Sequence, residues 1–314
     1  MKTATSGKRV VTAINSILDI LVLTGVVLLL TFAGYALWDS NQVFSAADKS
    51  QYAVYKPTVE DEGKSFQELQ AVNDEVFAWL NVYGTNIDYP VAQGQNNMKY
   101  VNTNAEGNYS LSGAIFLDSA NSGSFGDFDS IVYGHHMEKK TMFGEIGEFA
   151  EKDMFESHMY GNLYYDGVDH GLEFFAFVHA DAYDKSVFKP NVGDEQRQEY
   201  LDGLLSKAKH TRDVNVTTKD RIVLLSTCSS SSTNGRDILV GRITGDVYDD
   251  PFYKEITDDR TGLPGLMAGS DYIKQILLLM LIPVLVAAAF LGRCVFVIIF
   301  SRKQKLWTRS GVVK

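Results

Sequence analysis

Two long apolar segments enclose a polar middle in which apolar residues recur in short runs. The flanking segments span residues 10–37 and 274–300, and each is long enough to cross a bilayer with a hydrocarbon core of roughly 30 Å. A cleaved signal peptide is the alternative for the first segment. Its apolar part is longer than in most such signals, and no small-residue cleavage site follows at Trp38–Phe44. We therefore expect two transmembrane helices that flank one folded domain.

Basic residues lie at the outer end of both apolar segments. Lys2, Lys8 and Arg9 precede the first segment, and five Lys and Arg residues follow the second within residues 301–314. Because basic residues stay on the cytoplasmic side of a membrane, residues 1–9 and 301–314 should both be cytoplasmic. The polar middle is then outside the cell, held by a multi-pass membrane anchor.

The polar middle contains short runs rich in β-branched and aromatic residues between residues 65 and 246. Turn signals such as Asn234-Gly235 separate these runs, which is typical of β-strands. The predicted strands are Ile87–Val91, Ala114–Leu117, Ser130–Gly134, Leu163–Tyr165, Leu172–Ala180, Arg221–Ser226 and Ile238–Ile243. Their number and shortness predict a mostly β domain with a closed β-barrel, because closure removes strand edges that would otherwise aggregate.

Helical patterns precede and interrupt the strands. Ser65-Phe66-Gln67-Glu68 has the capping-box pattern of a helix start, and Asp194 stands where it can cap a helix over 195–208. A short helix is also expected over 142–149, after a strand. The apolar positions of the helix over 195–208 recur at helical spacing, which predicts that it packs against the barrel.

Polar segments join the folded domain to the apolar ones. Residues 38–64 are predicted to be a stalk, residues 65–246 one folded domain, and residues 247–273 an acidic linker. Residues 38–272 carry 19 Lys and Arg against 38 Asp and Glu, within a chain of 314 residues whose formal net charge is −10. Such an acidic domain repels phosphates, which argues against a nucleic-acid partner.

Cys228 is the one cysteine of the polar middle, because Cys294 lies in the second apolar segment. An intrachain disulfide is therefore not expected, and a lone thiol outside the cell is a candidate nucleophile. Cys228 follows one predicted strand and Arg236 opens the next, so a hairpin should bring thiol and guanidinium to one rim. An arginine stays charged and can stabilise an oxyanion. A solvated arginine at the rim is the alternative.

Two adjacent histidines, His135 and His136, follow the predicted strand Ser130–Gly134. Neighbours on a chain rarely point at one metal ion, and no third ligand stands at a recognisable spacing, so we predict neither a metal site nor a cofactor. A catalytic base is the preferred interpretation of the pair. A structural or surface histidine is the alternative.

The order His, Cys, Arg resembles the sortases, the membrane-anchored cysteine transpeptidases of Gram-positive bacteria. The segments that resemble their class B branch, over roughly Phe66–Gly245, are Asn86-Ile87-Asp88-Tyr89-Pro90-Val91, Ser112-Gly113-Ala114-Ile115-Phe116-Leu117-Asp118, Tyr133-Gly134-His135-His136-Met137, Thr141-Met142-Phe143-Gly144, Leu225-Ser226-Thr227-Cys228 and Asn234-Gly235-Arg236. The resemblance implies the eight-stranded sortase β-barrel with short helices. It also implies His135 as the catalytic histidine, Cys228 as the nucleophile and Arg236 as the catalytic arginine.

The resemblance extends to three positions that line the groove for the sorting signal in class B. Asn97, Val101 and Ser226 are similar to those positions. Some class B members carry an acidic residue just after the cysteine, where this chain has Ser229 and Ser230.

The resemblance implies acyl transfer from a C-terminal sorting signal, through a thioacyl enzyme, to an amine. The expected partners are surface proteins or pilins with such a signal, a peptidoglycan precursor or a pilin lysine as acceptor, and the lipid bilayer. Attachment to the cell wall is the preferred role, and pilin polymerisation is the alternative because a second apolar segment is more typical of pilin-polymerising sortases. A non-enzymatic surface-binding protein is the alternative of another class, and it predicts that Cys228→Ala leaves function untouched.

Overall fold

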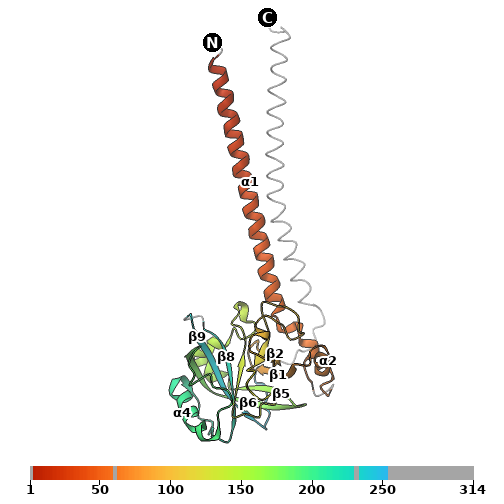
Figure 1. The fold of residues 1–314 in the computed structure, drawn as a ribbon, viewed down its shortest axis with the longest axis vertical. Coiled ribbons are helices and arrows are strands. Elements are labelled where there is room, and N and C mark those ends of the chain that lie inside the picture. Colours follow the sequence, from red (N-terminus) through yellow and green to blue (C-terminus); the bar gives the residue numbers. More distant parts are fainter. Residues whose placement is uncertain (1–2, 59–61, 230–232, 254–314) are drawn as a thin grey trace. The chain divides into compact units, whose positions relative to one another are not determined.

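The computed structural model describes residues 3–58, 62–229 and 233–253 (Figure 1). These residues divide into two units, the N-terminal helix through Asn41 and a compact domain that begins at Gln42. The second predicted membrane segment (residues 274–300), the tail and most of the acidic linker lie outside the described residues.

The N-terminal helix α1 (Thr3–Ala46) contains the first predicted membrane segment. Its stretch Val11–Ala46 has a mean hydropathy of 2.4 over its most apolar window, and side chains such as Leu29 and Phe32 are 70% exposed. By length and composition, it is the one helix of the described residues that could cross a membrane.

The range 38–64, predicted to be a stalk, contains residues that are packed in the structure. Helix α1 continues to Ala46, and the chain then enters the core of the domain, where Ala47 and Tyr52 are buried. The Tyr89 hydroxyl donates a hydrogen bond of 2.9 Å to the Ala47 carbonyl, and Lys56 forms an ion pair of 2.7 Å with Asp88. The range is polar because Asp and Lys side chains surround these few buried groups, so the polar pattern concealed the packing.

The domain is a closed β-barrel with one extra strand. The strands are β1 (Val76–Val82), β2 (Asp88–Ala92), β3 (Ile115–Leu117), β4 (Asp129–Tyr133), β5 (Tyr160–Tyr165), β6 (Val168–Asp181), β7 (Ala208–Thr211), β8 (Arg221–Cys228) and β9 (Gly235–Thr244). Eight of them form a ring in the order β5-β1-β2-β3-β4-β8-β9-β6, which pairing of β5 with β6 closes, and β7 adds to β6 outside the ring. Strand pairs β2–β3 and β4–β8 are parallel, and the others are antiparallel. The predicted eight-stranded barrel is confirmed.

Two strands and three helix starts differ from the sequence expectations. Strand β1, which is apolar on both faces, was not predicted, and β7 was missed because its short sequence is polar. Helix α2 (Lys64–Val72) begins after Gly63, and the Ser65 hydroxyl donates to the Lys56 carbonyl instead of capping the helix. Asp194 forms an ion pair with Arg197 rather than a cap. The helix expected over 142–149 is a 3₁₀-helix, Ile146–Ala150.

Short helices cover the barrel on its outer face. Helix α3 (Lys152–Ser157) follows the 3₁₀-helix, and Leu204 of α4 (Arg197–Lys207) belongs to the same buried apolar cluster as Ile222 and Leu224 of β8. The alternate residues of β8, Val223 and Leu225, belong to the core inside the barrel. This alternation confirms that the predicted helix packs on the barrel, and it defines which residues of β8 face outward.

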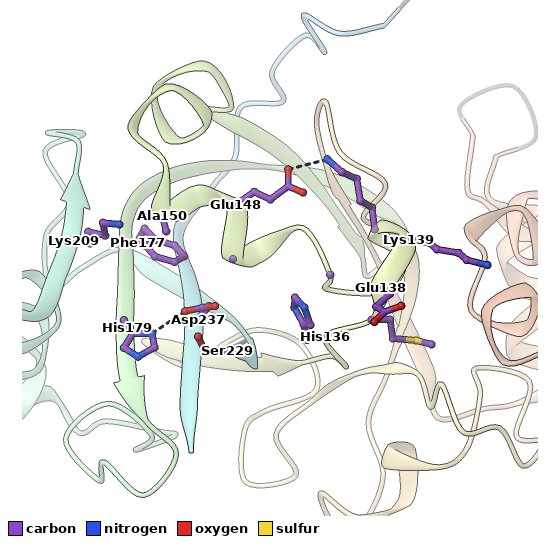
Figure 2. Close-up of a pocket in the computed structure, with 14 residues that line it drawn as sticks. His136, Glu138, Lys139, Glu148, Ala150, Phe177, His179, Lys209, Ser229 and Asp237 are labelled. Carbon is purple, nitrogen blue, oxygen red and sulfur yellow. Dashed lines mark hydrogen bonds and ion pairs between the residues drawn. The ribbon is translucent and has the colours of Figure 1, made fainter. Parts of the chain in front are cut away.

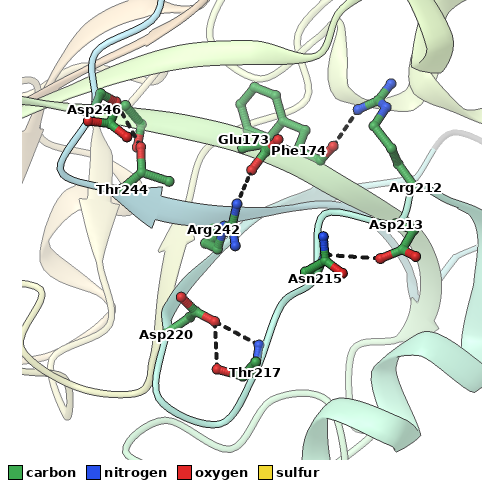
Figure 3. Close-up of polar contacts among 11 residues, drawn as sticks. Glu173, Phe174, Arg212, Asp213, Asn215, Thr217, Asp220, Arg242, Thr244 and Asp246 are labelled. Atoms are coloured by element: carbon green, nitrogen blue, oxygen red, sulfur yellow. Dashed lines mark hydrogen bonds and ion pairs between the residues drawn. The ribbon is translucent and has the colours of Figure 1, made fainter.

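Polar contacts join β6 to β9 and hold the segment that follows β7 (Figure 3). Arg242 of β9 forms an ion pair of 2.5 Å with its cross-strand partner Glu173 of β6. The Arg212 guanidinium, just after β7, donates to the backbone carbonyls of Phe174 and Phe155. These contacts attach β7 and helix α3 to the wall of the barrel.

Candidate active site

Cys228 and Arg236 face each other across the β8–β9 hairpin. Cys228 is the last residue of β8, and its direct Cα partner in β9 is Arg236. Directly opposite residues of an antiparallel pair project to the same face, and residues two apart on a strand share that face. Both side chains therefore lie on the outer face, in line with Ile222 and Leu224. Cys228 is a free cysteine and is exposed, as a nucleophile must be.

The parallel pairing of β4 with β8 leads the chain into His135 and into Cys228 at the same end of the sheet. Tyr133, the last residue of β4, is in register with Ser226, and the Gly134 amide donates to the Ser226 carbonyl at 3.2 Å. His135 directly follows Gly134, and Cys228 lies two residues after Ser226. The imidazole and the thiol thus come from segments far apart in sequence.

The ring of His135 is oriented by a backbone carbonyl. Its Nε2 lies 2.8 Å from the carbonyl oxygen of Val101. Because a carbonyl can only accept a hydrogen bond, Nε2 carries the proton, and Nδ1 of the neutral imidazole is left free to take one up. This arrangement suits a group that shuttles a proton through Nδ1.

Gly134 is required by the packing around this turn. A Cβ atom at Gly134 would lie 2.6 Å from Cδ1 of Ile115 and 2.7 Å from Cδ2 of Phe143. Both neighbours are buried in the barrel core. Because glycine has no side chain, the end of β4 can pass between Ile115 and Phe143, and His135 follows directly after it.

Tyr133 and Asp118, for which no role was predicted, form a polar cluster with Asn97 near Arg236. The Tyr133 hydroxyl donates to Oδ2 of Asp118 at 3.0 Å, and the Asn97 amide donates to the same oxygen at 2.8 Å. Burial raises the pKa of Tyr133, and the Asp118 carboxylate adds to the rise, whereas the positive charge of Arg236 opposes it. Arg236 is therefore within electrostatic reach of Tyr133. Asp118 ends one of the class B-like segments, which was the available signal.

The three predicted substrate-binding residues differ in what they contact. The Asn97 side chain is held by Asp118 and by the Ser119 amide, and Val101 offers its carbonyl to His135. Ser226 is 1% exposed, and its hydroxyl has no hydrogen-bond partner among the described residues. The structure brings these residues close to the His135 segment, with Ser226 packed beneath the surface rather than open to solvent.

A pocket of about 620 Å³ lies next to these groups, and its lining does not include them. Instead it includes His136, Ser229 and Asp237, the residues that directly follow His135, Cys228 and Arg236 (Figure 2). Within it, Nδ1 of His179 lies 2.8 Å from a carboxylate oxygen of Asp237. Among the described residues, no group of three or more His, Cys, Asp or Glu side chains is placed to hold a metal ion.

Comparisons with known proteins identify the class. No protein-family model matches the chain. Sortase B of Staphylococcus aureus is 32% identical over 183 residues, which are 57% of this chain and 74% of that protein. The crystal structure of sortase B from the type II pilus of Streptococcus pneumoniae is 47% identical with a TM-score of 0.51, and it covers 58% of this chain and 99% of its own. A class B sortase of Streptococcus pyogenes involved in pilus biogenesis is 39% identical with a TM-score of 0.54, over 58% and 99% of the two chains.

An eight-stranded barrel with these relatives is a cysteine transpeptidase of the sortase type. Within that type, the chain belongs to the class B sortases. The predicted family and the predicted enzyme class are confirmed.

Proposed function

We propose that this class B sortase cleaves a C-terminal sorting signal through a thioacyl intermediate on Cys228 and transfers the acyl group to an amine. The observation that carries the proposal is the pairing of an exposed thiol with a guanidinium on one rim, beside an imidazole whose Nδ1 is free. Structures of Staphylococcus aureus sortase B with a substrate and of a sortase B with triglycine are known. These complexes support a sorting-signal substrate and an amine acceptor.

In the first half of the proposed reaction, the Cys228 thiolate attacks the scissile carbonyl carbon. Because the thiolate is the nucleophilic form of cysteine, the Cys228 thiol passes its proton to Nδ1 of His135 as the sulfur attacks. Arg236 stabilises the oxyanion of the tetrahedral intermediate. The carbon–nitrogen bond then breaks, and His135 gives its Nδ1 proton to the leaving amine. Cys228 is left as a thioester.

In the second half, a neutral amine attacks the thioester carbon. A carbon–nitrogen bond forms, the carbon–sulfur bond breaks with its electron pair going to Cys228, and one proton of the amine passes to Nδ1 of His135. We assign Asn97, Val101 and Ser226 to the groove for the sorting signal, because they border the His135 segment and the Asp118 cluster.

Two amines are candidates for the acceptor. A cell-wall amine is the first, and a pilin lysine is the second. The second is favoured by the 47% and 39% identity to two sortases of pilus systems. Incubation of the acylated enzyme with a peptidoglycan-type glycyl amine and with a lysine-containing pilin peptide would separate the two candidates by the product formed.

We also propose that helix α1 anchors the enzyme in the cell membrane. The length and hydropathy of Val11–Ala46 support this, and the basic residues beside both apolar segments support cytoplasmic termini with the catalytic domain outside. In this arrangement the catalytic domain starts at about Gln42.

The test is acylation of Cys228. The full-length chain in detergent is incubated with candidate sorting-signal peptides, and mass spectrometry is used to find an acyl adduct on Cys228. Cys228→Ala, which keeps the fold because the side chain is exposed, should give no adduct and no cleavage. Absence of an adduct with every peptide, while the thiol still reacts with alkylating agents, would contradict the proposal. Unchanged function of Cys228→Ala would favour a non-enzymatic surface protein.

A further inference from the structure

The pocket behind the hairpin, here called the rear pocket, approaches the catalytic rim from a second side. Asp237 alternates with Arg236 on β9, so it projects to the opposite face of the strand. Thr227, Asp237 and His179 are direct partners across β8, β9 and β6 and share that inner face. Figure 2 shows His136 on one side of the rear pocket and Asp237 with His179 on the other. The pocket therefore reaches the rim from the side that the sorting-signal groove does not occupy.

The two substrates of a transpeptidase must reach the same carbon atom. The acyl chain occupies the outer face, where Cys228 and Arg236 project. An amine that attacks the thioester needs another path, because the acyl chain still fills the first. Ser229, the residue after Cys228, lines the rear pocket, so this pocket provides such a path.

Three carboxylates and three lysines line the rear pocket, and two of the carboxylates have no lysine or arginine partner within the described residues. The carboxylates are those of Glu138, Glu148 and Asp237. Of the lysines in the lining, Lys140 is held by Glu148 at 2.9 Å, and the Lys139 amine lies over the Phe44 ring at 4.4 Å. Asp237 and Glu138 make no ion pair with a lysine or arginine within the described residues.

Asp237 is the carboxylate that is best prepared to hold a cation. It is 7% exposed, and the His179 ring fixes its Oδ1 through the hydrogen bond of 2.8 Å. Its Oδ2 faces Gly147, where a Cβ atom would come within 3.0 Å of that oxygen. A side chain at Gly147 would therefore occupy the space next to Oδ2. Buried Phe177 supplies an apolar wall next to it.

We infer that the rear pocket binds the amine acceptor as a primary ammonium on an unbranched stem, with Asp237 as its ion partner. The inference rests on the proposed transpeptidase function and names the route of its second substrate. The ammonium loses one proton to solvent as it leaves Asp237 for the rim. The resulting amine then attacks the thioester, the carbon–sulfur bond breaks toward Cys228, and the second proton passes to His135.

Lys209 allows a test in which two substitutions should change acceptor binding in opposite directions. It lines the rear pocket, is exposed, and has no side-chain hydrogen bond or ion pair within the part of the chain that the structure describes. Its charge repels an incoming ammonium, whereas Asp237 attracts one. Asp237→Asn should therefore weaken acceptor capture, and Lys209→Gln should improve it. A structural role of Asp237 alone does not predict the second effect.

The experiment measures how the thioacyl enzyme divides between transfer and hydrolysis. The full-length chain in detergent is given a sorting-signal peptide and increasing concentrations of triglycine amide or Nα-acetyl-lysine methylamide. The ratio of transferred to hydrolysed product does not depend on how fast the thioester forms. Asp237→Asn should raise the half-saturating amine concentration roughly fivefold or more, and Lys209→Gln should lower it by about two- to fivefold.

Glu151→Gln is the matched control, because Glu151 is exposed and lies outside the pocket lining. It should leave the ratio unchanged. A response with triglycine amide alone assigns the pocket to a glycyl amine, one with the lysine derivative alone assigns it to a lysine, and a response with both assigns it to any primary ammonium.

Two failures are distinguishable. If no adduct forms on Cys228 in the unmodified enzyme, the proposed function fails before the pocket is tested. If the adduct forms but Asp237→Asn and Lys209→Gln leave the ratio as it was, or shift it in the same direction, the rear pocket is not the acceptor site. Because Lys209 is exposed, its replacement does not threaten folding, and the inference stays testable even if Asp237→Asn fails to fold.

Discussion

Replacing Gly134 by alanine tests whether the site depends on the packing of one strand end. The added Cβ would lie 2.6 Å from Ile115 and 2.7 Å from Phe143, about 1 Å inside the usual carbon–carbon contact of roughly 3.5–4.0 Å. Both neighbours are at most 1% exposed, so neither can move into solvent. Overpacking of this kind costs about 1–3 kcal/mol. For a domain of this size, 1 kcal/mol lowers Tm by roughly 2–4 °C.

Gly203→Ala is the matched control because it makes the same chemical change in open space. Gly203 lies inside helix α4, and nothing approaches within 4 Å of an added Cβ. Alanine is favoured over glycine in a helix by about 1 kcal/mol, so this variant should raise Tm by roughly 2–4 °C. The two alanine substitutions should thus shift Tm in opposite directions.

The assay is thermal unfolding of the full-length chain in detergent, followed by near-ultraviolet circular dichroism, which reports the packing of the aromatic core. Gly134→Ala should also slow thioester formation well below its Tm, because any shift of the strand end moves His135 from the Val101 carbonyl. Gly203→Ala should acylate at the normal rate. An unchanged Tm and an unchanged acylation rate in Gly134→Ala would refute the argument from packing.

Two further predictions concern single side chains. His135→Ala should abolish turnover of a sorting-signal peptide and His136→Ala should only weaken it, because the ring of His135 is oriented by a carbonyl whereas His136 lines the rear pocket. The reverse result would move the catalytic role by one residue. Burial raises the pKa of Asp129 to about 6, so its contribution to stability is complete below its unfolded pKa near 4 and is lost as pH rises through 6. Asp129→Asn should flatten the decline in stability between pH 4.5 and 7.5 measured by urea unfolding, and an equally steep decline in the variant would contradict this.

The predicted strands show how much of the secondary structure local sequence patterns can locate. Short runs of β-branched and aromatic residues bounded by turn signals, such as Arg221–Ser226, located seven of the nine strands, because such residues favour a buried strand. The two strands that were not predicted are β1, which is apolar on both faces, and β7. Strand β7 is polar and forms because β6 offers it a pairing edge. The packed residues of the predicted stalk were missed for the same reason. Ala47 and Tyr52 are buried by a surface that other segments build.

The candidate active site was likewise predictable only in part. The facing of Cys228 and Arg236 was predictable, because a short hairpin forces its two stems into register. The free Nδ1 of His135 was not predictable, because it depends on the carbonyl of Val101 in a separate loop. The rear pocket was also not predictable, since its walls come from four separate parts of the chain.

The sequence by itself determined the type of barrel, the two residues of the hairpin and the enzyme family, because short-range periodicity and local motifs encode them. Only the tertiary structure decided that β5 closes on β6, that parallel pairing of β4 with β8 leads the chain into His135 and into Cys228 at the same end of the sheet, and that Asp237 projects into a second pocket. The physical reason is that strand pairing between distant segments sets which side chains meet, and one strand's own pattern carries no information about its partner's register.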